Sequence, residues 1–191
     1  MEQGRFKNAV SMAHQLIRPL IPQAQVIVDM TCGNGHDTVF LAETMSDDAV
    51  LYAFDIQETA IRATKERVQE AGLQDKHVIY EQGSHDELLA NVQVTPDIIV
   101  FNLGYLPSGD HSIYTKREIT VKAIKICLNK IAENGIIMIA AYPGTPAGAD
   151  EAAAVHSLLQ GVPQKEFDIS MWQPVNQIHC PPLLYMIQKR G

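Results

Sequence analysis

Short hydrophobic runs alternate along the chain with longer segments in which apolar residues repeat every three or four positions. The runs predict buried parallel strands, and the repeating segments predict amphipathic helices. The expected strands are residues 26–28, 51–54, 78–80, 97–101 and 136–141, and the expected helices are 4–20, 38–45, 58–71, 115–131 and 151–160. Two further strands, 167–172 and 183–188, are expected to form an antiparallel hairpin at the edge of the sheet. The pattern therefore predicts an α/β fold with a mostly parallel sheet.

The length of 191 residues is enough for one α/β domain with a full core, so we expect a single domain over 1–191. In it, an N-terminal helix within 1–22 precedes a Rossmann-like core over 26–191. Hydrophobic residues at 46% and charged residues at 19% are typical of a globular protein, with no membrane partner and a cytoplasmic location expected. The three cysteines lie far apart, so neither a disulfide framework nor a metal site is predicted. A net charge of -7 argues against a protein that coats nucleic acid indiscriminately.

The most informative stretch begins where the first predicted strand ends. Asp29 closes this strand, and Gly33 and Gly35 follow in a turn where the backbone can bend tightly and approach a ligand. We expect Asp37 or Thr38 to cap the next helix. The second strand ends at Asp55, where an acid can accept hydrogen bonds from both ribose hydroxyls of an adenosine-containing cofactor.

The spacing of Thr31, Gly33 and Gly35 does not match a dinucleotide fingerprint, and the loop has no Walker lysine. The segment instead resembles motif I of the class I seven-stranded S-adenosylmethionine-dependent methyltransferases. That resemblance implies their Rossmann-like fold, with an antiparallel C-terminal edge hairpin, and S-adenosyl-L-methionine as cofactor. The cofactor-binding candidates are Asp29, Thr31, Gly33, Asn34, Gly35, Asp37, Thr38, Asp55, Ile56, Gln57, Ser84, His85 and Asn102. A glycine turn in some other α/β protein is the alternative.

The third and fourth predicted strands end in further polar residues. Ser84 or His85 is expected to lie against the adenine ring, since methyltransferases of this type place a residue there, and Asp86 is expected to cap a helix. The fourth strand runs into Asn102, three residues before Tyr105, a spacing that resembles the Asn/Asp-Pro-Pro-Tyr motif of amino-methyltransferases, although both prolines are missing.

An amide oxygen that accepts an amine N–H aims the nitrogen lone pair, and an aromatic face holds a cation. We therefore expect Asn102 and Tyr105 to orient an amine substrate, and Asp110 and His111 to bind or deprotonate its ammonium form. The alternative is that Asn102 caps a strand and Tyr105 packs in the core.

Candidate substrate contacts lie in three later segments. Lys116 and Arg117 begin a locally basic helix suited to RNA phosphates, although a solvated helix face is the usual explanation of such a run. Tyr142 opens a segment over 142–151 that is too rich in proline and glycine for regular structure. Trp172 and Asn176 are candidates for contact with a base, with edge packing of Trp172 as the alternative. His14 lies in the first helix, which in this class of fold often borders the active-site mouth; it is interpreted as a surface histidine without a chemical role, with contact to substrate as the alternative.

Four motifs together resemble a small bacterial family once labelled putative rRNA methylase, whose characterised members are of the MnmM type. The motifs are Asp-Met-Thr-Cys-Gly-Asn-Gly-His-Asp-Thr at 29–38, Asn-Leu-Gly-Tyr-Leu-Pro-Ser-Gly-Asp-His at 102–111, Tyr-Pro-Gly-Thr-Pro-Ala-Gly at 142–148, and Asn176 with Pro181-Pro182. This resemblance covers nearly the whole chain. It implies a tRNA-modifying enzyme that methylates the primary amine of 5-aminomethyl-2-thiouridine at the wobble position, with the anticodon stem-loop as partner.

The chain departs from that family at two positions and leaves other functions open. Thr145 stands where the family has histidine and Ala147 where it has glycine, which puts the substrate contacts of this loop in question. An N-methyltransferase for rRNA or a small molecule is one alternative, and a non-catalytic module that binds S-adenosylmethionine or RNA is another. The tRNA species, the need for the 2-thio group, a homodimer and the presence of a general base are left undecided.

Overall fold

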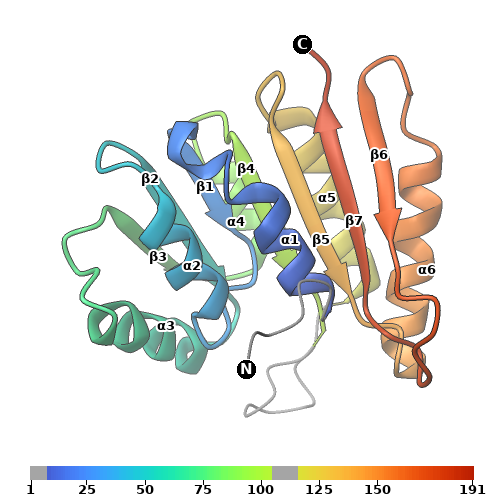
Figure 1. Cartoon of the computed structure of the whole chain (residues 1–191), viewed down its shortest axis with the longest axis horizontal. Helices are drawn as coiled ribbons and strands as arrows, with labels where there is room; N and C mark the ends of the chain where they lie inside the picture. Colours follow the sequence, from blue (N-terminus) through green and yellow to red (C-terminus); the bar gives the residue numbers. More distant parts are fainter. Residues whose placement is uncertain (1–7, 105–115) are drawn as a thin grey trace.

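The computed structural model describes residues 8–104 and 116–191, and these form a seven-stranded sheet with helices on both faces (Figure 1). The strands lie in the order β3-β2-β1-β4-β5-β7-β6. The first five pair in parallel, whereas β7 runs antiparallel to both β5 and β6. The strands are β1 (Val26–Asp29), β2 (Val50–Asp55), β3 (Val78–Gln82), β4 (Ile98–Asn102), β5 (Ile136–Ala141), β6 (Phe167–Trp172) and β7 (Leu183–Lys189). The predicted α/β class and the antiparallel edge pair are confirmed.

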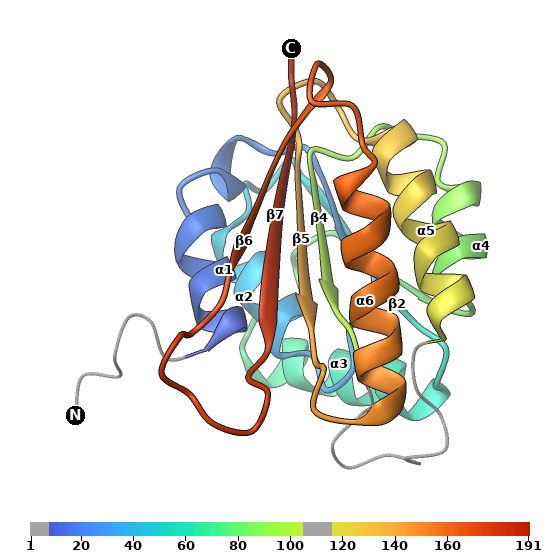
Figure 2. The same cartoon turned by 90° about the vertical axis from the view of Figure 1, so that its right-hand side faces the viewer.

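The helices divide between the two faces of the sheet (Figure 2). One face is covered by α1 and α2, with α3 packed against α2, and the other by α4, α5 and α6. Their bounds are α1 (Ala9–Ile17), α2 (His36–Thr44), α3 (Glu58–Glu70), α4 (His85–Asn91), α5 (Arg117–Lys130) and α6 (Pro146–Gln160), and a 3₁₀ turn, η1 (Ile21–Gln23), follows α1. Within the described ranges no helix is long and apolar enough to cross a membrane.

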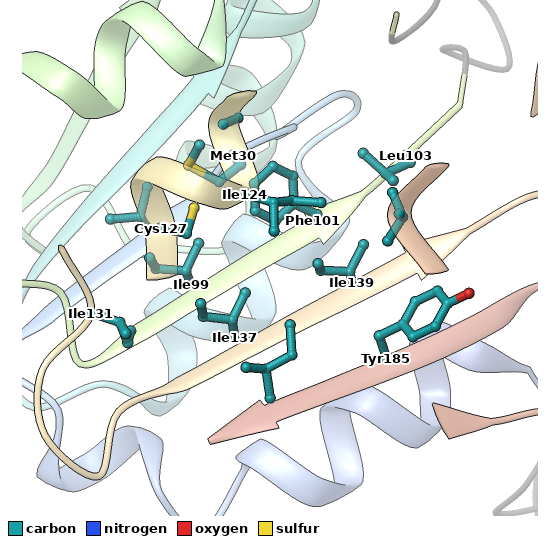
Figure 3. Packing of buried hydrophobic residues seen from close by; sticks show 14 of the residues in the cluster. Met30, Ile99, Phe101, Leu103, Ile124, Cys127, Ile131, Ile137, Ile139 and Tyr185 are labelled. Atoms are coloured by element: carbon teal, nitrogen blue, oxygen red, sulfur yellow. The ribbon is translucent and has the colours of Figure 1, made fainter. Parts of the chain in front are cut away.

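The alternation of side chains along β4 shows how the sequence fills both layers. Ile98 and Val100 join the cluster under α1 and α2, while Ile99 and Phe101 join the cluster under α4 to α6 (Figure 3). Because successive side chains of a strand point to opposite faces, a strand between two helical layers must be apolar throughout. The polar residue Asn102 then ends β4 at the carboxyl edge of the sheet.

Three local predictions are wrong at helix starts. The segment 146–151, expected to be irregular, is the beginning of α6, because Thr145 accepts a hydrogen bond from the Gly148 backbone N–H at 3.1 Å and Pro146 suits the first turn. Gly35, rather than Asp37 or Thr38, is the N-cap of α2, and it adopts a left-handed conformation. Ser84, not Asp86, is the N-cap of α4. Proline and glycine counts alone therefore misplaced the start of α6.

Candidate active site

The candidate site lies at the carboxyl edge of the parallel strands, where β1 and β4 are neighbours and β2 lies beside β1. Asp29, the last residue of β1, is in register with Ala53 of β2 and Val100 of β4. The chain reverses its direction along the sheet between β1 and β4, and open α/β sheets bind ligands at such a switch point. The fold therefore gathers Asp29, Asp55 and Asn102 at one edge.

The glycine loop is held from two sides. Gly33 and Gly35 have φ values of 52° and 81°, which favour glycine. The Thr64 hydroxyl of α3 donates to the Gly33 carbonyl at 3.0 Å, and Arg67 Nε donates to the Asn34 carbonyl at 2.5 Å. A Cβ on Gly35 would lie 2.9 Å from the Thr64 Cα, so the loop packs directly on α3. Hydrogen bonds and packing from α3 thus fix the conformation of the glycine loop.

Asp55 at the end of β2 anchors the other side of the loop. One carboxylate oxygen accepts the Gly33 N–H at 3.0 Å and the other accepts the Gln57 N–H at 2.9 Å. Burial raises the pKa of Asp55, and these backbone hydrogen bonds oppose the shift. A carboxylate can accept about four hydrogen bonds, so Asp55 keeps acceptor capacity for a ligand hydroxyl, and the neighbouring Ile56 side chain is 54% exposed. An acid and an exposed apolar side chain therefore stand side by side at this edge.

Asp29 supports the loop from beneath and is only 1% exposed. It accepts hydrogen bonds from the Thr38 hydroxyl at 2.6 Å and from the Thr31 N–H at 3.2 Å. Burial raises its pKa to about 7, and the nearby charge of Asp37 adds to the shift. The Thr31 hydroxyl in turn accepts the Asn102 backbone N–H at 2.7 Å. These bonds join the end of β1 to α2 and to the end of β4.

Asp37, in the first turn of α2, connects α1 with β4. One of its carboxylate oxygens lies 2.7 Å from His14 Nε2, and the other accepts the Asn102 side-chain N–H at 3.1 Å. The three side chains line one pocket between α1, α2 and the β4-β5-β7 part of the sheet. The sequence favoured a surface histidine and offered contact with substrate as the alternative, and its contact with Asp37 was not predicted. His14 is thus a half-buried residue of the candidate site, in contact with Asp37.

Tyr142 follows β5 and lies on the other side of Asn102. Burial raises the pKa of the Tyr142 hydroxyl to about 12, the charge of Asp37 adds to the shift, and a hydrogen bond with Asn102 opposes it. Gly104 has a φ of 120°, and a Cβ there would lie 3.8 Å from the Tyr142 ring. Tyr142 is therefore a neutral hydroxyl at the site at physiological pH.

At the end of β3, Ser84 and His85 have different surroundings. The Ser84 hydroxyl donates to the carboxylate of Asp86, which also forms an ion pair with Lys122. His85 is 9% exposed and meets the Phe101 ring edge-on at 5.8 Å between centroids. Burial lowers the pKa of His85, and its Nε2 has no partner among residues 8–104 and 116–191. This histidine is therefore neutral and retains unused hydrogen-bonding capacity.

The basic segment of α5 is largely neutralised by the protein itself. Arg117 pairs with Asp150 at 3.1 Å, and Lys122 pairs with Asp86 at 2.7 Å. Lys130 donates to carbonyls at the end of α4, including that of Leu89 at 2.9 Å. In the described part of the chain, Lys116 and Lys125 are the cations of this segment without such a bond.

The β6–β7 connection lies beside the loop after β5. Trp172 ends β6 opposite Leu184 and packs against the cluster under α1 and α2, whereas Asn176 is exposed. Because Leu183 is in register with Ala141, this connection meets the carboxyl edge of β5. Asn176 is thus an exposed residue at the same edge of the sheet as the candidate site. Three sequence-predicted site residues, Tyr105, Asp110 and His111, lie outside the described residues.

Comparisons with known proteins agree on one family. The family described as "Putative rRNA methylase" matches residues 51–188. A chloroplastic tRNA (mnm(5)s(2)U34)-methyltransferase of Arabidopsis thaliana is 29% identical over 196 residues, which cover 97% of this chain and 71% of that protein.

Two solved structures are similar over almost their entire length. One, described as a putative rRNA-methylase from Clostridium thermocellum, is 36% identical with a TM-score of 0.91, and the match covers 96% of this chain and 98% of that one. The other, a putative methyltransferase from Streptococcus mutans in complex with SAH, is 33% identical with a TM-score of 0.85, covering 96% and 99%. The predicted class I methyltransferase fold is confirmed by these matches.

Proposed function

The chain belongs to the "Putative rRNA methylase" family and is an S-adenosylmethionine-dependent methyltransferase, and we propose that its acceptor is the primary amine of 5-aminomethyl-2-thiouridine at the tRNA wobble position. The Arabidopsis thaliana relative, named for the methylated form of this nucleoside, supports the choice of acceptor. The product would be the 5-methylaminomethyl nucleoside.

The residues at the carboxyl edge fit the cofactor. The glycine loop, the Asp55 carboxylate and the exposed Ile56 side chain offer contacts for the methionine part, the ribose and the adenine, respectively. Arg67 of α3, the cation bonded to this loop, donates to the Asn34 carbonyl and so supports the loop itself. Bound S-adenosylmethionine supplies an activated methyl group on a sulfonium. We assign Gly33, Gly35, Asp55 and Ile56 to holding it, with Asp29 supporting the loop from below.

The orientation of the Asn102 amide is the observation that carries the proposed reaction. A carboxylate only accepts hydrogen bonds, so the Asn102 amide must turn its NH₂ group toward Asp37. Its carbonyl oxygen is thereby directed elsewhere and has two lone pairs, one of which can accept an amine N–H. Such a bond fixes the direction of the amine lone pair, which direct displacement requires.

The nucleophile must be the neutral amine, so the substrate ammonium has to lose a proton before reaction. Activity should therefore rise with pH until that ammonium is deprotonated, and we assign no side chain of the described residues as an obligatory base. A rate that is independent of pH across neutrality would mean that this proton loss does not limit turnover.

The proposal is tested with tRNA isolated from cells that lack the protein. The purified protein is incubated with this tRNA and labelled S-adenosylmethionine, and the nucleosides are analysed by mass. The expected result is the gain of one methyl group by the aminomethyl nucleoside. Label that stays on the cofactor, although the cofactor binds, would overturn the assignment of the acceptor. Asn102→Ala, which should lose turnover but retain cofactor binding, distinguishes an enzyme from a binding module.

A further inference from the structure

His14 is held rigidly on α1 by two kinds of contact. Its imidazole stacks on the Phe40 ring with centroids 3.7 Å apart and planes 7° from parallel. Its Nε2 lies 2.7 Å from the Asp37 carboxylate, and the two side chains are 26% and 14% exposed, respectively. The Arg18 guanidinium also lies 4.7 Å from the Phe40 centroid. Stacking and hydrogen bonding together leave the ring little rotational freedom.

The hydrogen bonds continue from His14 through Asp37 to Asn102. Since both Asp37 oxygens are acceptors, the hydrogens must lie on His14 Nε2 and on Asn102 Nδ2. The Asn102 backbone is fixed separately by the Thr31 hydroxyl at 2.7 Å. Loss of His14 therefore frees one oxygen of the Asp37 carboxylate and loosens one of the two side-chain contacts that orient the Asn102 amide, the other being with Tyr142, while the end of β4 stays in place.

We propose that His14 is a positioning residue for methyl transfer, which acts through Asp37 to hold the Asn102 carbonyl oxygen toward the acceptor amine. The inference rests on the proposed function, because the direction of that oxygen matters only when an amine binds there. Among residues 8–104 and 116–191, the charged and titratable groups near this chain of bonds are Asp29 of β1, Tyr142 after β5 and Arg18 after α1. Each of the three is engaged elsewhere: Asp29 accepts from Thr38, Tyr142 bonds with Asn102, and Arg18 lies over the Phe40 ring.

Two substitutions separate the hydrogen bond from the stacking contact. His14→Phe keeps an aromatic ring on Phe40 but has no N–H, whereas His14→Gln keeps an N–H donor and loses the ring. His77→Phe is the matched control, because His77 is exposed and lies just before β3, at the opposite edge of the sheet. All variants are made in the full chain, and their folding is checked by thermal unfolding.

The first readout requires no substrate. The side-chain ¹⁵N–¹H signals of Asn102 are identified by their loss in Asn102→Ala. We expect these signals to shift in His14→Phe, to return toward the wild-type position in His14→Gln and to stay unchanged in His77→Phe. Unchanged Asn102 signals in a folded His14→Phe variant would overturn the proposal.

The second readout is the kinetics of methyl transfer to tRNA. His14→Phe should lower kcat about tenfold with KM for tRNA changed by less than about twofold, because the amide is misdirected after the substrate has bound. His14→Gln should recover most of the loss. In the Asn102→Ala background, His14→Phe should add little, since residues that act through one another are not additive. An equal loss in both backgrounds would contradict a role through Asn102.

The two readouts distinguish the failure of this inference from the failure of the proposed function. If the wild-type protein methylates no aminomethyl nucleoside but the Asn102 signals respond to His14→Phe, the acceptor is wrong and the coupling stands. If the wild-type protein methylates the aminomethyl nucleoside of tRNA but the Asn102 signals do not change in His14→Phe, the coupling of His14 to Asn102 is wrong and the proposed function stands.

Discussion

Three aspartates at the carboxyl edge have different roles, although each follows a strand or begins a helix. Asp55 bonds to the glycine loop next to the exposed Ile56, Asp29 is buried beneath the loop, and Asp37 joins His14 to Asn102. Their sequence positions predict that all three gather near the cofactor. Only the hydrogen-bond partners show which one has free lone pairs, which one is a support and which one orients another side chain.

Asp55→Ala should weaken cofactor binding. The substitution removes the acceptor of the Gly33 N–H and the candidate acceptor of the ribose hydroxyls, so we expect the Kd for S-adenosylhomocysteine to rise about 10- to 100-fold. Titration calorimetry measures this change. Asp75→Ala, at an exposed turn residue, is the control. Equal affinities of the Asp55→Ala variant and the wild-type protein would exclude Asp55 from the cofactor site.

The raised pKa of Asp29 makes a prediction about stability and pH. Its pKa rises from 3.8 to about 7 on folding, so between these values the folded state binds more protons than the unfolded state. The contribution of Asp29 to the free energy of unfolding therefore falls as pH rises through this window. The side chain of the Asp29→Asn variant cannot ionise. The unfolding free energy of this variant, relative to that of the wild-type protein, should therefore increase between pH 5 and pH 8. Urea unfolding at both pH values measures the difference, and parallel pH profiles would refute it.

At the scale of elements, the turn between β1 and α2 depends on its packing against α3. Gly35 and Gly72 both have positive φ, at 81° and 73°, but a Cβ on Gly35 would lie 2.9 Å from the Thr64 Cα, whereas a Cβ on Gly72 would point into open space. The two glycines thus share a conformational requirement and differ in the space around them.

This pair allows a matched comparison. Gly72→Ala should cost roughly 1–2 kcal/mol of unfolding free energy, the cost of a left-handed alanine. Gly35→Ala should cost at least about 1 kcal/mol more, because α2 and α3 must also move apart. Urea denaturation gives both values. Equal losses would show that the loop does not press on α3.

The hydrophobic pattern of the sequence was enough to predict where the strands lie. The start of α6 and the contact between α1 and α2 depend on individual hydrogen bonds, and these were not predicted. Continuous apolar runs located the parallel strands, because burial between two helical layers leaves little choice of residue. The start of α6 was missed because the Thr145 cap and Pro146 together favour a helix start that composition alone reads as a loop. The His14–Asp37 contact joins residues 23 positions apart on different helices, which no local pattern encodes.

At the scale of the whole molecule, RNA binding must be reconciled with a net charge of -7. Several cations of α5 already pair with Asp86, Asp150 or helix carbonyls, which leaves Lys116 and Lys125 as the candidates for phosphate contact in the described part of this segment. The predicted basic surface is therefore smaller than the sequence indicates.

Lys116→Glu combined with Lys125→Glu should raise KM for tRNA about tenfold and reduce the salt dependence of binding, because two phosphate contacts would be lost. The Kd for S-adenosylhomocysteine should not change. Lys165→Glu, at an exposed turn before β6, is a control for a charge reversal elsewhere on the surface, with half the change of net charge. If the double variant keeps the wild-type KM and salt dependence, these lysines do not bind the substrate.

The central claim is that the acceptor is the wobble aminomethyl group and that Asn102 orients it. The most direct measurement compares methyl transfer to two anticodon stem-loops that differ only in that group, one with 5-aminomethyl-2-thiouridine and one with 2-thiouridine. We expect the wild-type protein to methylate only the first and Asn102→Ala to lower that rate about 100-fold or more, with Asn91→Ala, at an exposed residue of α4, as the unaffected control. Equal methylation of both stem-loops, or full activity of Asn102→Ala, would contradict the account.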